Sequence, residues 1–107
     1  MKKKDIIWSD RAERSYGRII DYVASEFGKT HAKKYIAKVY SEVNKLRTNP
    51  FLGQKELLLV GARYEFRHLV IEDLTKIIYR VTEQTVEIAD VWDTRQRPEE
   101  LAARITE

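Results

Sequence analysis

Residues 64–92 read YEFRHLVIEDLTKIIYRVTEQTVEIADVW and decide the fold. The stretch contains three runs rich in β-branched and aromatic residues, and two polar pairs, Glu72-Asp73 and Glu83-Gln84, separate these runs. Short polar turns between runs of this kind are typical of antiparallel hairpins. The sequence therefore predicts an antiparallel meander of three strands, at Tyr64 to Ile71, Thr75 to Thr82 and Thr85 to Trp92.

The sequence before this stretch predicts a strand followed by a helical hairpin. Lys3 to Trp8 reads as a short strand, and Ser9 or Asp10 can cap the helix that follows. Apolar residues then recur at spacings of three and four, and Gly28 is a natural end for this helix because glycine adopts the left-handed conformation easily. Thr30 is expected to cap a second amphipathic helix. The two apolar stripes need a further surface to cover them, which the meander can supply.

The remaining segments complete an α+β fold. The second helix is expected to end before Pro50, since the residue before a proline disfavours the helical region. Residues 51–62 have no clean period and read as a linker with a short strand or turn at 57–60. Proline and acids at the start of 98–105 predict a short C-terminal helix. We expect one domain over 1–107: an N-terminal strand, an antiparallel two-helix hairpin packed on one face of a curved antiparallel sheet, and a short C-terminal helix, with the other face of the sheet available for function.

The composition narrows the chemistry. The chain contains no cysteine, which excludes disulfides, a thiolate metal site and a cysteine nucleophile. The two histidines, His31 and His68, lie far apart in the sequence and have no carboxylates at metal-ligand spacing, so neither a metal nor another cofactor is expected. The net charge of +3 and the pI near 9.2 permit binding to nucleic acid or to an acidic partner, but they are also common in ordinary soluble proteins.

The N-terminus is basic but does not predict secretion. After Met1-Lys2-Lys3-Lys4 the apolar run is only Ile6-Ile7-Trp8, which is too short for the core of a signal peptide. No stretch of the chain is long and apolar enough to predict a membrane-spanning helix. We therefore expect a cytoplasmic protein with no membrane partner.

Basic residues in the last third of the chain are the candidates for binding phosphate or an acidic target. A guanidinium inside an apolar strand, as at Arg67, needs either a ligand phosphate or a carboxylate, for which Glu65, Glu87 and Asp93 are the alternatives. A pair of cations on one strand face can contact phosphates, or can be solvated edge charges that discourage aggregation. Loops after a strand are where binding residues concentrate. The candidates are Arg67, Lys76, Arg80, Arg95 and Arg97.

Tyr79 and His68 are the candidates for proton transfer. Tyr79 can donate a proton or stack on a base, although a tyrosine in a strand is more often a core residue. His68 can act as acid or base near neutral pH, but it has no obvious carboxylate or nucleophile beside it. Motifs for phosphate loops, catalytic triads and paired carboxylates are absent from the sequence. An enzyme of this composition would therefore position the 2′-hydroxyl of RNA between cationic side chains.

Five motifs in order resemble the RelE/ParE superfamily of type II toxin-antitoxin toxins, and the resemblance covers nearly the whole chain. The segment from Arg67 to Arg80 is closer to the ParE, or plasmid-stabilisation, branch. The motifs are Trp8-Ser9-Asp10-Arg11-Ala12, Asn49-Pro50-Phe51-Leu52-Gly53-Gln54, Tyr64-Glu65-Phe66-Arg67, Lys76-Ile77-Ile78-Tyr79-Arg80-Val81 and Val91-Trp92-Asp93-Thr94-Arg95-Gln96.

The resemblance implies a small cytoplasmic toxin that inhibits growth and that an antitoxin encoded beside it holds inactive. RelE-like members cleave mRNA in the ribosomal A site without a metal, whereas ParE-like members inhibit DNA gyrase. Arg67 and Arg95 match the cationic positions of the RelE pattern, and with Tyr79 they are the catalytic candidates. The late aromatic of that pattern falls near Leu101, and no histidine or tyrosine follows Trp92. A ParE-like toxin is therefore the first expectation, and a ribosome-dependent endoribonuclease is the second.

The resemblance also implies how the antitoxin binds. An antitoxin helix is expected across the hydrophobic face of the hairpin and an antitoxin strand at an exposed sheet edge. An acidic antitoxin tail would neutralise Arg67, Arg80 and Arg95. A third alternative is a non-toxic nucleic-acid-binding module that uses the same basic sheet, but the acidic residues interleaved along the strands disfavour a strong basic face.

Overall fold

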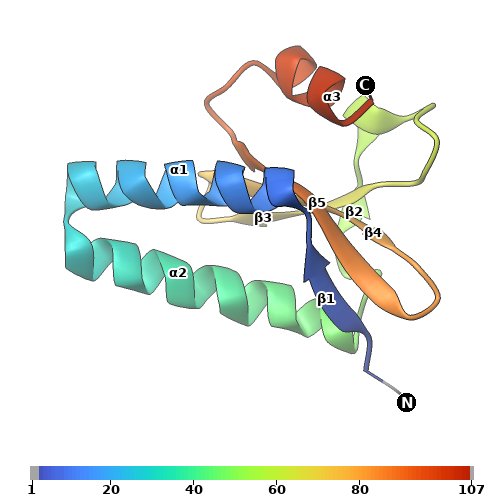
Figure 1. Cartoon of the computed structure of the whole chain (residues 1–107), viewed down its shortest axis with the longest axis horizontal. Coiled ribbons are helices and arrows are strands. Elements are labelled where there is room, and N and C mark those ends of the chain that lie inside the picture. The colour runs from blue at the N-terminus through green and yellow to red at the C-terminus, as the bar shows by residue number, and fades with distance from the viewer. Residues whose placement is uncertain (1–2, 107) are drawn as a thin grey trace.

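The computed structural model describes residues 3–106 and confirms the α+β fold (Figure 1). Met1 and Lys2, the first two residues of the basic N-terminus, lie outside the described residues. In chain order the elements are β1 (Asp5–Trp8), α1 (Asp10–Phe27), α2 (Lys29–Asn44), a 3₁₀ turn (Lys45–Arg47), β2 (Gln54–Lys55), a second 3₁₀ turn (Leu57–Leu59), β3 (Arg67–Ile71), β4 (Thr75–Val81), β5 (Thr85–Asp93) and α3 (Pro98–Thr106).

The strands form one sheet in the order β1-β5-β4-β3-β2. The meander of β3, β4 and β5 is antiparallel, as its polar turns predict. The sheet is not wholly antiparallel, however, because β1 pairs in parallel with β5. Two helices and three strands separate β1 from β5 in the chain, which gives ample length for the crossover that parallel pairing requires. Because β1 pairs with β5 alone among the described strands and stands first in the strand order, it is an edge strand of the sheet.

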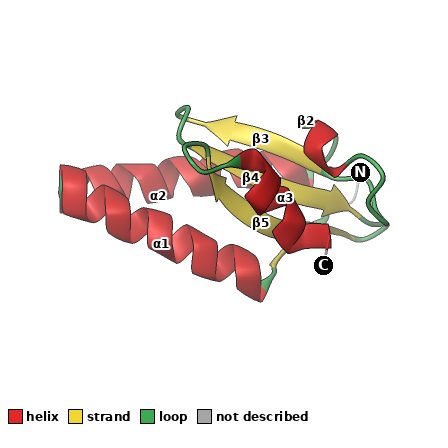
Figure 2. Ribbon diagram, turned by 90° about the horizontal axis from the view of Figure 1, so that it is seen from above, coloured by secondary structure: helices red, strands yellow, loops and turns green. Residues whose placement is uncertain are grey.

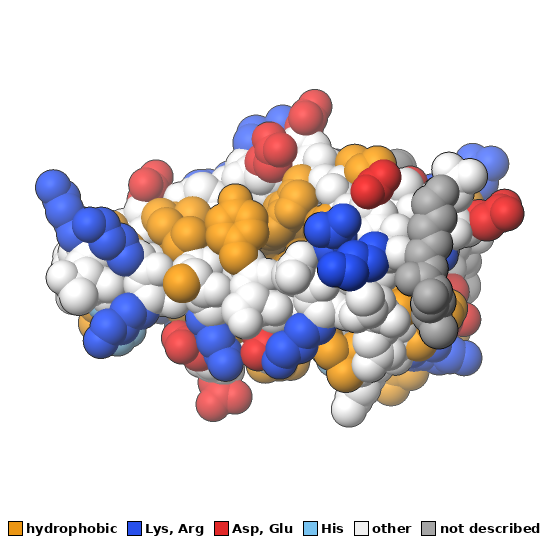
Figure 3. Space-filling view, turned by 90° about the horizontal axis from the view of Figure 1, so that it is seen from below, with side chains coloured by type: hydrophobic (Ala, Val, Ile, Leu, Met, Phe, Trp, Pro, Cys, Tyr) orange, Lys and Arg blue, Asp and Glu red, His pale blue; other side chains and the backbone are white. Residues whose placement is uncertain are grey.

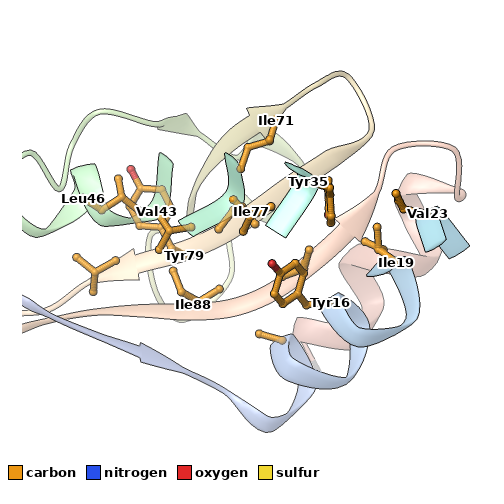
Figure 4. Packing of buried hydrophobic residues seen from close by; sticks show 14 of the residues in the cluster. Tyr16, Ile19, Val23, Tyr35, Val43, Leu46, Ile71, Ile77, Tyr79 and Ile88 are labelled. Atoms are coloured by element: carbon orange, nitrogen blue, oxygen red, sulfur yellow. The ribbon is translucent and has the colours of Figure 1, made fainter. Parts of the chain in front are cut away.

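Helices cover both faces of the sheet. The α1–α2 hairpin packs on one face, where Figure 4 shows Tyr16 and Tyr35 pointing toward the sheet residues Ile77 and Ile88. On the other face α3 lies across β4 and β5 (Figure 2). Leu101 of α3 packs there with the fully buried Trp92. The expectation that this second face is free is therefore wrong in part. Without α3, apolar side chains of β4 and β5 would be exposed on this face, so it needs a cover as well.

The ends of the two helices were predicted at Ser9, Gly28 and Thr30. Ser9 caps α1 as predicted, since its hydroxyl oxygen accepts a hydrogen bond from the Ala12 amide at 3.0 Å. Gly28, with a φ of 91°, closes α1 and also precedes the first residue of α2. Its amide donates to the Ala24 carbonyl and its carbonyl accepts from the Ala32 amide. Because α2 already begins at Lys29, the prediction that Thr30 caps it is wrong.

The linker before the meander also differs from its prediction. The short strand lies at Gln54–Lys55, where β2 pairs with β3, and residues 57–59 form a 3₁₀ turn, which is the second of the two alternatives predicted for 57–60. β3 begins at Arg67, three residues later than predicted. The carboxylate of Glu56 accepts a hydrogen bond from the Leu58 amide at 3.2 Å, and this local contact favours the turn over an extended chain.

The helices of the described chain are too short or too polar to cross a membrane.

Candidate functional site

The strand register divides the candidate residues between the two faces of the sheet. Arg67 lies opposite Tyr79 in the pairing of β3 with β4, and Tyr79 packs in the core beneath α1 and α2. Lys76 and Arg80 point to the other face, because Ile78 between them belongs to the cluster under α3. The candidate cations therefore do not form one continuous cluster.

Arg67 is held by groups of its own chain. Its guanidinium donates a hydrogen bond to the Gly53 carbonyl at 2.8 Å and lies 3.3 Å from a carboxylate oxygen of Glu65. The guanidinium carbon also lies 5.0 Å from the centre of the Phe51 ring. Glu65 is one of the three carboxylates that the sequence offers to this arginine. The contacts orient Arg67 across the start of β2.

Tyr79 is fully buried, and its hydroxyl is used twice. It donates to the Pro50 carbonyl at 2.9 Å and accepts from the Gly53 amide at 2.9 Å. Burial raises the pKa of the hydroxyl above its ordinary value, so the tyrosine stays protonated at neutral pH. Tyr79 therefore fastens the segment before β2 to the sheet, and its side chain is not exposed to solvent.

Lys76 forms a buried charge cluster that the sequence does not reveal. Its ammonium forms an ion pair with Glu56, a carboxylate that is only 4% exposed. The Nδ1 atom of His68 lies 3.4 Å from the same carboxylate oxygen. Burial, and next the charge of Lys76, lowers the pKa of His68, so the imidazole is neutral at pH 7. The ammonium also lies 5.4 Å from the centre of the Trp92 ring.

Arg80 lies on the same face as Lys76, nearer to β1. Its Nε donates to a Glu87 carboxylate oxygen at 3.0 Å, and its guanidinium carbon stacks 3.9 Å from the centre of the Tyr64 ring. Glu87, another of the three carboxylates that the sequence offers to Arg67, is thus the partner of Arg80. Arg80 keeps a quarter of its side chain exposed, so it can still contact a further group from solvent.

The two arginines after β5 lie at the edge of the molecule. Arg95 binds both carboxylate oxygens of Asp93, at 2.9 and 2.5 Å, and its guanidinium carbon lies 4.0 Å from the centre of the Tyr22 ring. Hydrogen bonds from Arg95 hold the pKa of Asp93 below its usual range. Arg97 is exposed and lies near Glu99 and Glu100. Arg95 lies against Tyr22 of α1, whereas Lys76 lies over Trp92 on the opposite face of the sheet.

Sequence reasoning missed two structural carboxylates. Glu56 follows a short strand without a hydrophobic period, so nothing in the sequence signals its burial. Asp90 is fully buried and accepts hydrogen bonds from the Val91 amide, from the Trp92 indole at 3.0 Å and from Arg104 of α3 at 2.7 Å. An acid inside an apolar strand is a signal that could have flagged Asp90.

Two grooves flank β1. One has a volume of about 720 Å³ and lies between β1 and α2, lined among others by Ile6, Trp8 and Tyr40. Figure 3 looks at this side of the molecule and shows hydrophobic side chains gathered in its middle, with lysine and arginine side chains around them. The second groove has a volume of about 630 Å³ and lies on the other side of β1, where Ile7 and Arg80 help to line it.

In the described part of the chain, no three histidine, aspartate or glutamate side chains are grouped so that they could hold a metal ion.

The fold and sequence together define a toxin of a type II toxin-antitoxin system. The sequence matches the family described as the ParE toxin of the type II toxin-antitoxin system parDE over residues 6–98. Because this match spans most of the chain, the protein belongs to the ParE toxin family. Comparison with curated protein sequences gives no match.

A solved structure supports the same fold. A chain described as part of the chromosomal ParDE TA system from P. aeruginosa superimposes with a TM-score of 0.69. The two chains are 17% identical, and the similarity covers 85% of this chain and 96% of the other. At this level of identity the comparison shows a shared fold.

Proposed function

We propose that this protein is a single-domain, ParE-like toxin that acts in the cytoplasm, interferes with DNA gyrase and so stops replication and growth, and is neutralised by an antitoxin encoded beside it. Membership of the ParE family is the observation that carries the proposal. A role in maintaining the replicon that carries the gene pair, plasmid stabilisation, follows from the same pairing of toxin and antitoxin.

The site geometry gives less support to the alternative, mRNA cleavage on the ribosome. That reaction needs an accessible acid or base, which typically contributes a factor of about a hundred to ten thousand in rate. Tyr79 is buried with both hydrogen bonds used, and His68 is neutral and packed against Lys76. Arg67 and Arg95 each face a carboxylate. A non-toxic nucleic-acid-binding module is likewise disfavoured, because these pairs remove much of the positive charge that phosphate binding would use.

The groove between β1 and α2 is our proposed docking site for the antitoxin. It is lined by apolar side chains of both elements, and Tyr40 at its rim is more than half exposed. β1 is an edge strand, so its outer side can pair with an added strand. A partner that adds a strand to β1 would place its side chains directly over this groove. Tight neutralisation requires a large, mostly apolar interface of this kind.

The first experiment tests toxicity, neutralisation and target class together. The protein is induced in a bacterial host with and without the neighbouring antitoxin gene, and growth and genome-wide mRNA 5′ ends are recorded after brief induction. We expect growth arrest that the antitoxin relieves, without new 5′ ends inside codons. New ends within the codons of translated messages would instead establish the ribosome-dependent nuclease. Unimpaired growth would show that this chain is not a toxin in that host.

A further inference from the structure

The second groove beside β1 combines an apolar floor with arginine side chains. We call it the arginine groove: its floor includes Ile7, Phe66 and Ile105, and Arg11, Arg14 and Arg80 line its walls. Arg11 and Arg14 come from the first turns of α1, whereas Arg80 comes from β4 and Ile105 from α3. Elements distant in the sequence therefore build this groove together. Arg63, beside Tyr64, adds a fourth guanidinium in the adjoining pocket, which shares Tyr64, Phe66 and Ile105 with the arginine groove.

Most guanidiniums here lack a carboxylate partner. Elsewhere the arginines of the sheet and α3 pair with acids, and within the groove Arg80 pairs with Glu87. Among the described residues, the side chains of Arg11 and Arg14 form neither a hydrogen bond nor an ion pair, and that of Arg63 has only its contact with the Tyr64 ring, at 5.3 Å. Three guanidiniums at the rim of an apolar groove are suited to bind carboxylates of a segment whose apolar side chains fill the floor.

The chemistry of the groove favours an acidic peptide over a nucleic acid. Sequence-tolerant binding of single strands uses aromatic rings on which bases stack. Tyr64 is the only exposed aromatic ring in the lining, and the guanidinium of Arg80 already covers it at 3.9 Å. The rest of the floor is aliphatic apart from the buried Phe66. Aliphatic side chains can pack against the apolar residues of a peptide, but they can neither stack on bases nor form hydrogen bonds with the edges of bases.

The arginine groove shares a wall with the proposed antitoxin site. Along β1 the side chains alternate between the faces, so Ile6 and Trp8 line the groove beside α2 while Ile7, half exposed, lines the arginine groove. A chain that covers the free edge of β1 would reach both grooves. We propose, on the basis of the proposed function, that an acidic, apolar-containing segment of the same antitoxin occupies the arginine groove, with its carboxylates on Arg11, Arg14 and Arg63.

The test reverses the charge of the groove without disturbing the helix. Arg11→Glu/Arg14→Glu places acids in the first turns of α1, where the helix dipole favours negative charge, so folding should be kept. Lys33→Glu/Lys34→Glu is the matched control: it makes the same charge change at two exposed positions of α2 whose side chains form no hydrogen bond or ion pair with the described residues. Circular dichroism confirms that both variants are folded, and calorimetric titration with the purified neighbouring antitoxin measures affinity.

We expect the groove variant to bind the antitoxin at least about tenfold more weakly, with a smaller salt dependence, and the control to stay within about threefold of the wild type. Overlapping peptides that together span the antitoxin should show that the peptide which binds the wild type but not the groove variant is acidic. Unchanged antitoxin affinity in the groove variant would overturn the inference. If toxicity or binding of a labelled single-stranded RNA fell instead, the groove would belong to the target. A wild-type protein that does not bind the antitoxin at all would overturn the proposed function, and this inference with it.

Discussion

At the scale of single residues, the cations that look available in the sequence are tied to carboxylates in the fold. Lys76 faces Glu56, Arg80 faces Glu87 and Arg67 faces Glu65. A half-buried cation loses hydration, and a partner carboxylate offsets that cost. The pairs on the sheet are therefore first of all part of its packing, whereas the unpaired arginines of the arginine groove remain available to a partner.

The substitution Tyr79→Phe distinguishes a structural role of the hydroxyl from a catalytic one. Loss of the hydroxyl leaves the Gly53 amide and the Pro50 carbonyl without their partner, so we expect the free energy of unfolding to fall by about 1–3 kcal/mol. Toxicity per folded molecule should be unchanged, because the hydroxyl has no route to a substrate. Urea denaturation and growth after induction measure the two effects. A fully stable variant that has lost toxicity would contradict the structural role.

His68 makes stability depend on pH below neutrality. Its pKa is lowered in the fold by burial and by Lys76, so the unfolded chain takes up the proton first as the pH falls. The free energy of unfolding should therefore decline as the pH drops below about 6.5, the ordinary histidine value, and level off once the folded state is protonated too. Denaturation at several pH values measures this slope. The slope should be smaller in His68→Gln, and an equal slope in that variant would assign the effect to other groups.

At this scale the sequence predicts only part of the site. Ser9 as the cap of α1 follows from residue type and position, and Glu65 is among the partners that the sequence offers Arg67. The partner of Lys76 could not be predicted, because Glu56 comes from a linker without a period and is brought to the sheet by the two-residue strand β2. Contacts between segments far apart in sequence depend on the tertiary fold.

At the scale of elements, the polar turns of the meander predict β3, β4 and β5, and apolar spacing predicts α1 and α2. The pairing of β1 is different, because alternation along a strand does not say which neighbour it takes or in which direction. The β2 pairing was missed because a two-residue strand is too short to carry a period, and for the same reason the sequence left strand and turn as alternatives at 57–60. These short segments nevertheless hold Glu56 and Gly53 against the sheet.

A substitution at Gly53 tests how closely the segment before β2 packs against β3 and β4. A Cβ at this position would lie 2.5 Å from the His68 carbonyl and 2.6 Å from the Tyr79 hydroxyl, so Gly53→Ala should reduce the free energy of unfolding by about 1–3 kcal/mol. Gly17→Ala is the matched control, since its Cβ meets nothing within 4 Å inside α1, and it should raise the stability by about 0.5–1 kcal/mol. Thermal unfolding gives both values. Equal changes of the same sign would contradict the packing around β2.

At the scale of the whole molecule, helices on both faces of the sheet leave β1 as an edge with a groove on either side. The groove beside α2 is apolar and the arginine groove is cationic, so a partner that follows β1 meets both kinds of surface.

The measurement that tests the central claim most directly is plasmid supercoiling by purified DNA gyrase and ATP in the presence of this protein. Our account predicts that supercoiling of relaxed plasmid is lost as the toxin is added, and that toxin mixed beforehand with its antitoxin has no effect. Supercoiling that proceeds at the same rate at every toxin concentration, with a preparation that arrests growth, would contradict the account and direct attention to a different target.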